Sequence, residues 1–302
     1  MPKAAFLFPG QGAQFVGMGR QLIDMLPAAR QLFDQAADIL GYNLTDVCLN
    51  GPAERLNSTA VSQPAIFVAS LAALENLRAT NSQAESDCVA TAGLSLGEYT
   101  ALVFAGALSF ADGLRLVQKR GAAMQAASDA TPSGMVSILG LDQDKVEELC
   151  AAARSAGKIE IANLLCPQNI VVSGAKAACA EVERLAPEKG AMKTVRLTVA
   201  GAFHTDLMKP ADQILGSALA GTALRPCRVP VWSNVDAELH LHGDEFRSLL
   251  VRQVLQPVLW EKTMRNLLAQ GVERFYEIGP GRVLTPLLKR INRKVDCQNV
   301  PA

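Results

Sequence analysis

Short apolar runs alternate with amphipathic segments along most of the chain. Residues 4–8 form one such run, and residues 87–92 form another that leads into a glycine-bounded stretch at 93–97. Both runs have the length and composition of buried strands. Because helical patterns follow them, the sequence predicts a parallel sheet covered by helices, which is an α/β fold.

Helices are expected where apolar residues recur every three or four positions. These segments are residues 21–26, 31–40, 65–77, 99–106, 113–127, 210–219, 246–254, 260–269 and 283–291. Gly41 ends the second of them, and Ser62-Gln63-Pro64 opens the third. Two further strands are expected at 229–234 and 274–278.

The pattern changes at Thr131-Pro132-Ser133-Gly134. Beyond this point it predicts strands and helices in the order βαββαβ. The strands are residues 135–139, 159–164, 169–173 and 192–199, and the helices are residues 142–156 and 175–186. This order is that of a ferredoxin-like unit. We therefore expect a ferredoxin-like subdomain at 131–199, inserted into an α/β domain that comprises residues 1–130 and 200–302.

Composition excludes several classes of protein. Of the 302 residues 49% are hydrophobic and the formal net charge is zero, which argues against disorder and against a dedicated nucleic-acid binder. No uninterrupted apolar run reaches the roughly 18–20 residues of a membrane span, and the first residues carry no signal-peptide pattern. We expect a cytoplasmic protein, or an organellar one if an upstream transit segment has been removed.

The seven cysteines are scattered and include no Cys-x-x-Cys pair. Free thiols in a reducing compartment are therefore expected, with Cys88 and Cys150 as small core residues. His240 and His242 alternate within the acidic stretch 236–245, a spacing that metal sites also use. No further ligand cluster stands near them, so a solvated loop is favoured and no metal site is expected.

The stretch Gly93-Leu94-Ser95-Leu96-Gly97 carries the strongest chemical signal. A serine at a strand-to-helix turn, with glycine two residues to either side, is the pattern of a nucleophile elbow. The glycines let the backbone turn sharply and leave Ser95 exposed, and the following helix directs its N-terminal N–H groups toward any negative charge that forms there. The alternative is an N-cap serine that glycines flank by chance.

A serine hydroxyl is a weak nucleophile until a base takes its proton. Two of the three histidines lie in the acidic stretch, which leaves His204, next to small residues that let its side chain approach a site. Asp206 is too close along the chain to be a firm third member. A backbone carbonyl or an amide side chain also suffices to orient the base.

The glycine-rich loop Pro9-Gly10-Gln11-Gly12-Ala13-Gln14 follows the first strand. It lacks the third glycine of a dinucleotide fingerprint and the Gly-Lys-Ser/Thr of a P-loop. We interpret it as backbone brought close to a reacting centre, against the alternative of an ordinary tight turn. An oxyanion hole needs two N–H donors. Leu96 supplies one by the geometry of the elbow, and Gln11 is the candidate for the other.

Five motifs follow one another along nearly the whole chain. They are Gly10-Gln11-Gly12-Ala13-Gln14, Gly93-Leu94-Ser95-Leu96-Gly97-Glu98, Gln118-Lys119-Arg120-Gly121, Gly201-Ala202-Phe203-His204-Thr205 and Glu277-Ile278-Gly279-Pro280-Gly281. Together they resemble the malonyl-CoA:acyl-carrier-protein transacylases of fatty-acid and polyketide synthesis. The resemblance implies an α/β-hydrolase-like parallel-sheet core that carries the ferredoxin-like insert.

The resemblance also implies roles for individual residues. Ser95 matches the acylated nucleophile and His204 its base. Gln11 and Leu96 match the oxyanion-hole positions. Arg120 matches the arginine that binds the free carboxylate of malonate, a task suited to a bidentate guanidinium.

Further positions match the family less uniformly. Gln253 falls where the family orients its histidine through a main-chain carbonyl. Phe203 is similar to a phenylalanine whose bulk disfavours α-branched acyl groups, and Met124 is expected in the same pocket. Asn163 keeps the first asparagine of the family's substrate-binding Asn-x-Asn-x-Pro-Gly-Gln segment, most of which differs here. Leu94 stands where many relatives have histidine, so a polar contact behind the nucleophile is absent or replaced.

The resemblance implies a ping-pong enzyme: Ser95 takes malonyl from malonyl-CoA and passes it to the phosphopantetheine thiol of acyl carrier protein, supplying extender units for fatty-acid synthesis. We expect a monomer that has no permanently bound cofactor and that binds neither nucleic acid nor a membrane. A serine hydrolase or thioesterase is the second interpretation, but it lacks an HGGG-type loop and does not explain Arg120. A non-catalytic carrier-protein docking module is the third, and it has no need of both Ser95 and His204.

Overall fold

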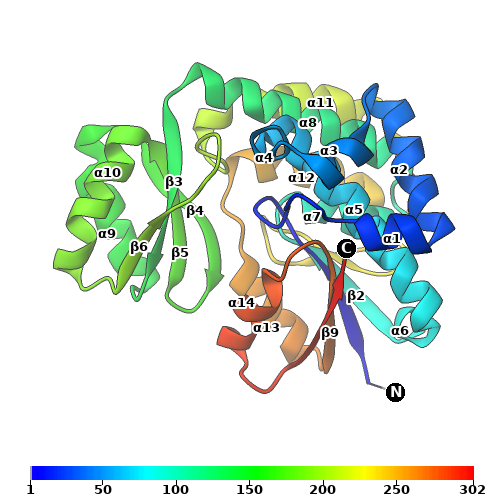
Figure 1. The fold of residues 1–302 in the computed structure, drawn as a ribbon. Helices are drawn as coiled ribbons and strands as arrows, with labels where there is room; N and C mark the ends of the chain where they lie inside the picture. Colours follow the sequence, from blue (N-terminus) through cyan, green and yellow to red (C-terminus); the bar gives the residue numbers. More distant parts are fainter. Residues whose placement is uncertain (1) are drawn as a thin grey trace.

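The computed structural model describes residues 2–302, which form two units, each built on its own β-sheet (Figure 1). The strands of the larger sheet are, in order across it, β10 (Asp296–Pro301), β9 (Arg274–Gly279), β1 (Ala4–Phe8), β2 (Cys88–Gly93), β7 (Val231–Trp232) and β8 (Leu239–His240). Every neighbouring pair is parallel except β7 and β8. The prediction of an α/β fold with a mostly parallel sheet is therefore confirmed.

Strand β1 shows why the central strands form uninterrupted apolar runs. Phe6 and Phe8 belong to the core on one face of the sheet, whereas Ala5 and Leu7 belong to the core on the other. Successive side chains of a strand point to opposite faces, so a strand with both faces covered is apolar throughout.

Helices cover both faces of the larger sheet. They are α1 (Arg20–Met25), α2 (Pro27–Leu40), α3 (Leu44–Asn50), α4 (Ala53–Asn57), α5 (Thr59–Thr80), α6 (Ser82–Ser86), α7 (Gly97–Phe104), α8 (Phe110–Ala130), α11 (Ala211–Ala220), α12 (Phe246–Leu255), α13 (Trp260–Ala269) and α14 (Leu284–Ile291). Trp260 of α13 and Leu284 of α14 pack into the same core as Leu7. Phe67 of α5 and Leu102 of α7 pack into the opposite core.

Helix α5 begins earlier than the sequence predicts. The expected start at Ser62-Gln63-Pro64 is wrong, because the helix starts at Thr59 and Pro64 lies inside it. Pro64 has no backbone N–H and cannot donate a helical hydrogen bond. The contacts of Gln63 with Arg120 and Met124 of α8 outweigh this cost. By length and composition α5 passes as a membrane span, yet 78% of its most apolar window is buried inside the protein. It is therefore a core helix of this fold.

Two glycines let α8 lie close against its neighbours. A β-carbon at Gly113 would stand 2.9 Å from Cζ of Phe67, and one at Gly121 would stand 2.8 Å from the main-chain oxygen of Thr59. Because neither glycine carries a side chain, α8 and α5 approach closely. This approach brings Arg120, next to Gly121, to the face of α5.

Several short elements escape the sequence pattern. Helices α3, α4 and α6 have five to seven residues, too few to display a helical period. Strand β10 has a mostly polar sequence and ends at Pro301, as edge strands allow. Strand β7 is shorter than expected because its pairing with β2 covers only Val231 and Trp232. The described residues also contain four 3₁₀ helices: η1 (Arg154–Ala156), η2 (Ala186–Lys189), η3 (Asp206–Met208) and η4 (Gly243–Glu245).

The smaller unit contains an antiparallel sheet with two helices. Across the sheet the strands are β4 (Ile159–Cys166), β5 (Asn169–Ala175), β3 (Ser133–Leu139) and β6 (Lys193–Arg196), and the helices are α9 (Gln143–Ala153) and α10 (Lys176–Leu185). Along the chain they follow one another as βαββαβ, the order that the sequence predicts. Helices α9 and α10 lie on the side away from the larger unit (Figure 1). The backbone of Val258 joins the units, donating to the oxygen of Ala162 and accepting from the N–H of Leu164, both at 2.9 Å.

The cysteines are free thiols. Cys88 lies in β2 and Cys150 in α9, and both are buried in apolar cores, as the sequence predicts. Burial raises the pKa of each of these thiols to about 12, so both stay protonated and unreactive.

Candidate active site

The turn between β2 and α7 holds Ser95 in a conformation that glycines make possible. A β-carbon at Gly93 would stand 1.9 Å from the carbonyl carbon of Gly97, and one at Gly97 would stand 2.1 Å from the main-chain oxygen of Phe8. Ser95 itself has a φ of 52°, and the N–H of Leu94 donates to the oxygen of Phe8 at 3.0 Å. The serine thus lies at the carboxyl ends of β1 and β2, the edge where parallel α/β sheets bind ligands.

His204 is the partner of this serine. Its Nε2 lies 3.0 Å from Oγ of Ser95, and its Nδ1 lies 2.6 Å from the main-chain oxygen of Gln253. A carbonyl oxygen only accepts, so Nδ1 carries the proton and Nε2 is left to accept from the serine hydroxyl. Burial, followed by the nearby charge of Arg120, lowers the pKa of His204 to about 4. The imidazole is therefore neutral at neutral pH and able to take a proton.

A side chain that the sequence did not single out supports the nucleophile from behind. Oδ1 of Asn234 accepts from the N–H of Ser95 at 2.6 Å, and its Nδ2 donates to the oxygen of Gly93 at 2.8 Å. The polar contact expected to be absent or replaced at Leu94 is thus supplied by Asn234, while Leu94 packs against the core under α13 and α14. No motif marks Asn234, because it follows a two-residue strand.

Arg120 brings a buried positive charge to the serine. Its Nη1 donates to Oε1 of Gln63 at 2.7 Å, and its Nη2 donates to Oγ of Ser95 and to Oε1 of Gln253, both at 3.0 Å. Its guanidinium also lies 5.4 Å from the ring centre of Tyr99. Within residues 2–302 no carboxylate forms an ion pair with Arg120, and burial lowers its pKa. A buried cation among neutral groups favours an anionic ligand.

A small cavity of about 80 Å³ joins these groups. Its lining contains eight of the nine residues singled out from the sequence: Gln11, Ser95, Leu96, Arg120, Met124, Asn163, Phe203 and His204. Gln253 lies behind the cavity and reaches it through its contacts with His204 and Arg120. Asn163 belongs to β4 of the smaller unit, and its buried Oδ1 has no hydrogen-bond partner in the described part of the chain. The cavity therefore lies where the two units meet and accepts only a small group.

The loop after β1 presses against the elbow. A β-carbon at Gly10 would stand 2.4 Å from the main-chain oxygen of Leu94, so glycine permits this contact. Gln11, the next residue, lines the cavity together with Leu96. Neither backbone N–H donates a hydrogen bond within residues 2–302. Two free N–H donors next to a serine are the requirement for an oxyanion hole.

Gly10 and Leu94 also line the cavity, from the loop and the elbow that the sequence marks. The sequence does not single out four further lining residues: Gln63, Met135, Leu197 and Val199. It indicates Gln63 only as part of a helix start, and no local signal marks its contact with Arg120. Met135, Leu197 and Val199 come from the smaller unit and carry no motif, because apolar lining residues look like core residues in a sequence.

The last of the five motifs serves the fold instead of the cavity. Glu277 is fully buried at the end of β9, and its carboxylate accepts from the N–H groups of Val283, Leu284 and Thr285 at 2.6–2.8 Å. It thereby satisfies the free N–H groups at the start of α14.

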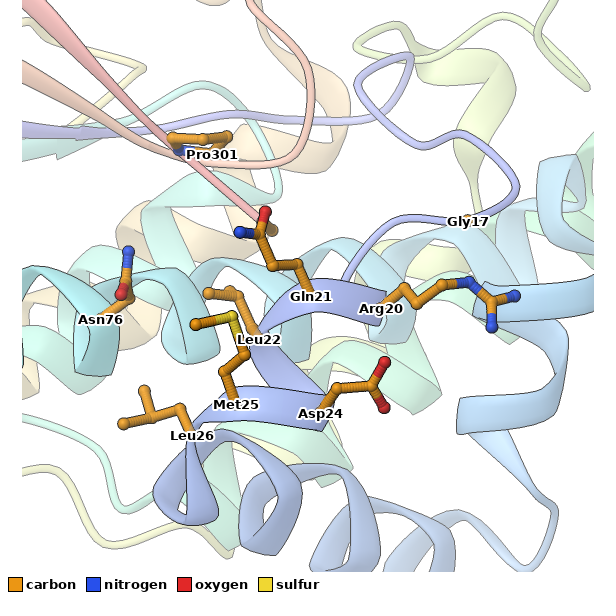
Figure 2. Close-up of a pocket in the computed structure, with 10 residues that line it drawn as sticks. Gly17, Arg20, Gln21, Leu22, Asp24, Met25, Leu26, Asn76 and Pro301 are labelled. Carbon is orange, nitrogen blue, oxygen red and sulfur yellow. The ribbon is translucent and has the colours of Figure 1, made fainter.

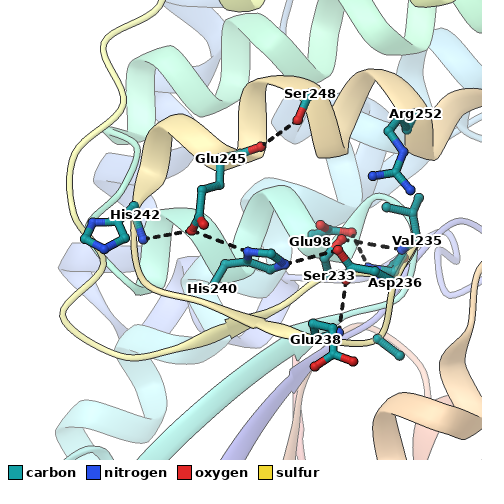
Figure 3. A network of polar contacts seen from close by, with 12 residues as sticks. Glu98, Ser233, Val235, Asp236, Glu238, His240, His242, Glu245, Ser248 and Arg252 are labelled. Carbon is teal, nitrogen blue, oxygen red and sulfur yellow. Dashed lines mark hydrogen bonds and ion pairs between the residues drawn. The ribbon is translucent and has the colours of Figure 1, made fainter.

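The two histidines of the acidic stretch lie elsewhere (Figure 3). His240 stands between Asp236 and Glu245, with nitrogen–oxygen distances of 3.2 and 3.3 Å. Among the described residues no group of three or more His, Cys, Asp and Glu side chains is arranged to hold a metal ion. These contacts attach the β7–β8 hairpin to α12.

A larger depression of about 810 Å³ lies beside α1, next to Asn76 and Pro301 (Figure 2). Its lining contains no serine, cysteine or histidine. This depression therefore offers no side chain that could act as a serine, cysteine or histidine nucleophile. A serine beside a neutral histidine, two free N–H donors and a buried cation together have the features of a site for acyl transfer through a serine.

Comparison with known proteins agrees with this class. The acyl transferase domain model matches residues 5–301. Malonyl CoA-acyl carrier protein transacylase of Bacillus subtilis is 41% identical over 296 residues, which cover 98% of this chain and 92% of the relative. The mitochondrial malonyl-CoA-acyl carrier protein transacylase of Homo sapiens is 43% identical over 301 residues, which cover 96% of this chain and 77% of the relative.

A solved structure gives the same result. It contains a type II PKS acyl-carrier protein in complex with its malonyl-transacylase, and it matches with a TM-score of 0.94 and 36% identity, covering 99% of this chain and 96% of the other. The chain belongs to the acyl transferase domain family and, within it, to the malonyl CoA-acyl carrier protein transacylases.

The low pKa of His204 predicts the pH dependence of the reaction. A base acts only when it is neutral, so the rate falls as pH drops through its pKa. We expect kcat/KM with malonyl-CoA, which reports the free enzyme, to decline near pH 4 instead of near the usual value of about 6.5. Circular dichroism at each pH separates loss of activity from loss of fold.

Histidine variants provide the controls. His204→Ala should lower kcat/KM by roughly 10²–10⁴-fold, the usual worth of a general base. His240→Ala and His242→Ala should leave the rate and its pH profile nearly unchanged. An acid limb centred near pH 6.5 in the folded wild-type enzyme would contradict the assignment of a buried neutral base.

Proposed function

We propose that this chain transfers the malonyl group from malonyl-CoA to the phosphopantetheine thiol of acyl carrier protein and so supplies extender units for fatty-acid synthesis. The observation that carries the proposal is Arg120, a buried cation 3.0 Å from the Ser95 hydroxyl that has no carboxylate partner in the described chain. Malonyl differs from acetyl by one carboxylate. A carboxylate is the partner that the charge of this arginine lacks.

The first half-reaction acylates the serine. His204 takes the proton of Ser95 Oγ as this oxygen attacks the thioester carbonyl carbon. The N–H groups of Gln11 and Leu96 stabilise the oxyanion of the tetrahedral intermediate. As the intermediate collapses, the carbon–sulfur bond breaks, and coenzyme A leaves as a thiol with the proton from His204.

The second half-reaction reverses these steps with a different thiol. The phosphopantetheine thiol gives its proton to His204 and attacks the malonyl ester of Ser95. Collapse returns the serine hydroxyl and leaves malonyl on the carrier protein. The carbonyl of Gln253 accepts from Nδ1 in both half-reactions, so it fixes the tautomer of the neutral imidazole and stabilises the imidazolium that forms.

The remaining lining residues set the choice of acyl group. Arg120 binds the distal carboxylate in a bidentate manner, which only a planar guanidinium offers. Met124 and Phe203 line the cavity, and the bulk of Phe203 disfavours α-branched acyl groups. Asn163 offers its unpaired oxygen to the thioester substrate.

We further propose an assignment for the two units. The strand order β4-β5-β3-β6, with the chain order βαββαβ, supports a ferredoxin-like subdomain at 131–199. The elbow at the carboxyl ends of parallel strands supports an α/β-hydrolase-like core formed by 1–130 and 200–302.

The chemistry also suggests the working form of the enzyme. Ser95 and His204 come from one chain, so a monomer contains the complete site. Serine and histidine perform acyl transfer unaided, so we propose no permanently bound cofactor, with malonyl-CoA as substrate. Acyl carrier protein is the partner bound in the similar complex. We place the activity in the cytoplasm or, as for the mitochondrial human relative, in an organelle.

One assay separates transfer from hydrolysis. Purified enzyme is incubated with malonyl-CoA, with and without phosphopantetheinylated carrier protein, and malonyl-carrier protein and free malonate are measured. We expect malonyl-carrier protein to form much faster than malonate. Faster release of malonate would favour a thioesterase, and no turnover of either kind would favour a docking module.

Removal of the arginine tests the choice of malonyl. Loss of one partner of a buried charge pair costs about 2–5 kcal/mol, so Arg120→Ala should lower kcat/KM for malonyl-CoA by roughly 30-fold or more. Acetyl-CoA has no carboxylate to leave unpaired, so its slow reaction should change far less.

Arg115→Ala is the matched control. Arg115 lies on the same helix and is exposed, and its one ion pair within residues 2–302 is with Asp112 at 3.5 Å. Its removal should affect neither substrate. An equal loss of malonyl and acetyl transfer in Arg120→Ala would rule out the carboxylate-binding role.

A further inference from the structure

Glu98 is a fully buried acid that the reaction steps above leave unused. It lies in the first turn of α7, three residues after Ser95. Burial, more than any nearby charge, raises the pKa of its carboxyl group to about 8, so the group is mostly protonated at neutral pH. Its Oε1 has no hydrogen-bond partner in the described part of the chain. An acid retained in such surroundings costs stability, which points to a function.

The other oxygen of Glu98 contacts two groups of the active site. Oε2 accepts from Nε2 of Gln253 at 2.7 Å and from the N–H of Asn234 at 3.2 Å. Figure 3 shows the carboxyl group beside the loop that carries Ser233 and Asp236. Gln253 and Asn234 are the residues that hold the main chain of Ser95. Glu98 is therefore one contact away from the nucleophile on two sides.

The contact between Glu98 and Gln253 determines the orientation of the Gln253 side-chain amide. Nε2 donates to Oε2 of Glu98 and to the main-chain oxygen of Ser95, at 2.7 and 2.9 Å. Both amide protons are thus directed at oxygens, so Oε1 must face the opposite way, toward Nη2 of Arg120 at 3.0 Å. A reversed amide would point N–H groups at a guanidinium, which only donates.

The Gln253 amide in turn fixes one nitrogen of the Arg120 guanidinium. Nη2 donates to Oε1 of Gln253 and to Oγ of Ser95, while Nη1 donates to Gln63. If Gln253 turned, Nη2 would lose one of these acceptors and its direction toward the cavity would be less well fixed. The guanidinium must be aligned to bind both oxygens of a carboxylate.

We propose that Glu98 is a positioning residue for acyl selectivity: it fixes the Gln253 amide, which directs Arg120 at the carboxylate of the acyl group. This inference rests on the proposed malonyl transfer. A neutral carboxyl oxygen is enough for the task, because the contact requires an acceptor and no charge. A glutamine at position 98 therefore still offers the oxygen that Gln253 needs, whereas a leucine of similar size offers no acceptor.

The test compares Glu98→Gln with Glu98→Leu by the ratio of kcat/KM for malonyl-CoA to kcat/KM for acetyl-CoA. Glu98→Leu should lower this ratio by roughly tenfold or more, as for one lost hydrogen bond to a charged group. Glu98→Gln should keep a ratio close to that of wild type. A purely structural role would lower both activities together, and that result, or an unchanged ratio in Glu98→Leu, would overturn the inference.

A second variant covers the case in which Glu98→Leu does not fold. Glu98→Asp keeps the acid but withdraws its oxygen by one methylene, so the ratio should fall in the same direction, and an unchanged ratio would overturn the inference. The wild-type enzyme, assayed alongside, separates failure of the proposed malonyl transfer from failure of the role of Glu98. Absence of malonyl transfer in wild type refutes the proposed function and the inference with it. Normal transfer in wild type with unchanged ratios in the variants refutes the inference alone.

Discussion

The close approach of three backbone segments at the elbow is the constraint on which the site depends. The end of β1, the end of β2 and the start of α7 meet so tightly that a single methyl group at Gly93 or Gly97 would overlap main-chain atoms. This contact gives Ser95 its positive φ and aims its hydroxyl at His204. It also places the N–H of Leu96 and the loop of Gln11 at one side of the cavity. The groups proposed as nucleophile, base and oxyanion donors therefore depend on one backbone geometry.

The electrostatics of the cavity follow from burial. An unpaired ion away from water costs several kcal/mol, yet Arg120 is held there by Gln63, Gln253 and Ser95, which are neutral. The same surroundings keep His204 neutral and Glu98 mostly protonated at neutral pH. The free enzyme thus keeps one buried positive charge beside the nucleophile. In the proposed reaction a substrate carboxylate supplies the missing counter-charge, which would link the fold to the choice of acyl group.

Much of this could be predicted from the sequence because the signals are local. Short-range physical causes explain the apolar runs of β1 and β2, the glycines around Ser95 and the order βαββαβ of the smaller unit. Glu98, Asn234 and Gln63 could not be assigned, because their roles arise from contacts between segments far apart in the chain. The start of α5 was misplaced for the same reason: packing against α8 outweighs the preference of Pro64. Burial of Arg120 was likewise invisible in a helix pattern where most arginines are solvated.

The central claim is that the carboxyl end of β2 presents a serine that becomes acylated. The most direct measurement is mass spectrometry of peptides after incubation with malonyl-CoA and no acceptor. We expect one malonyl group on the peptide that contains Ser95, and none on a folded Ser95→Ala variant. Malonyl found on another residue of that variant, in an amount comparable with wild type, would contradict the account.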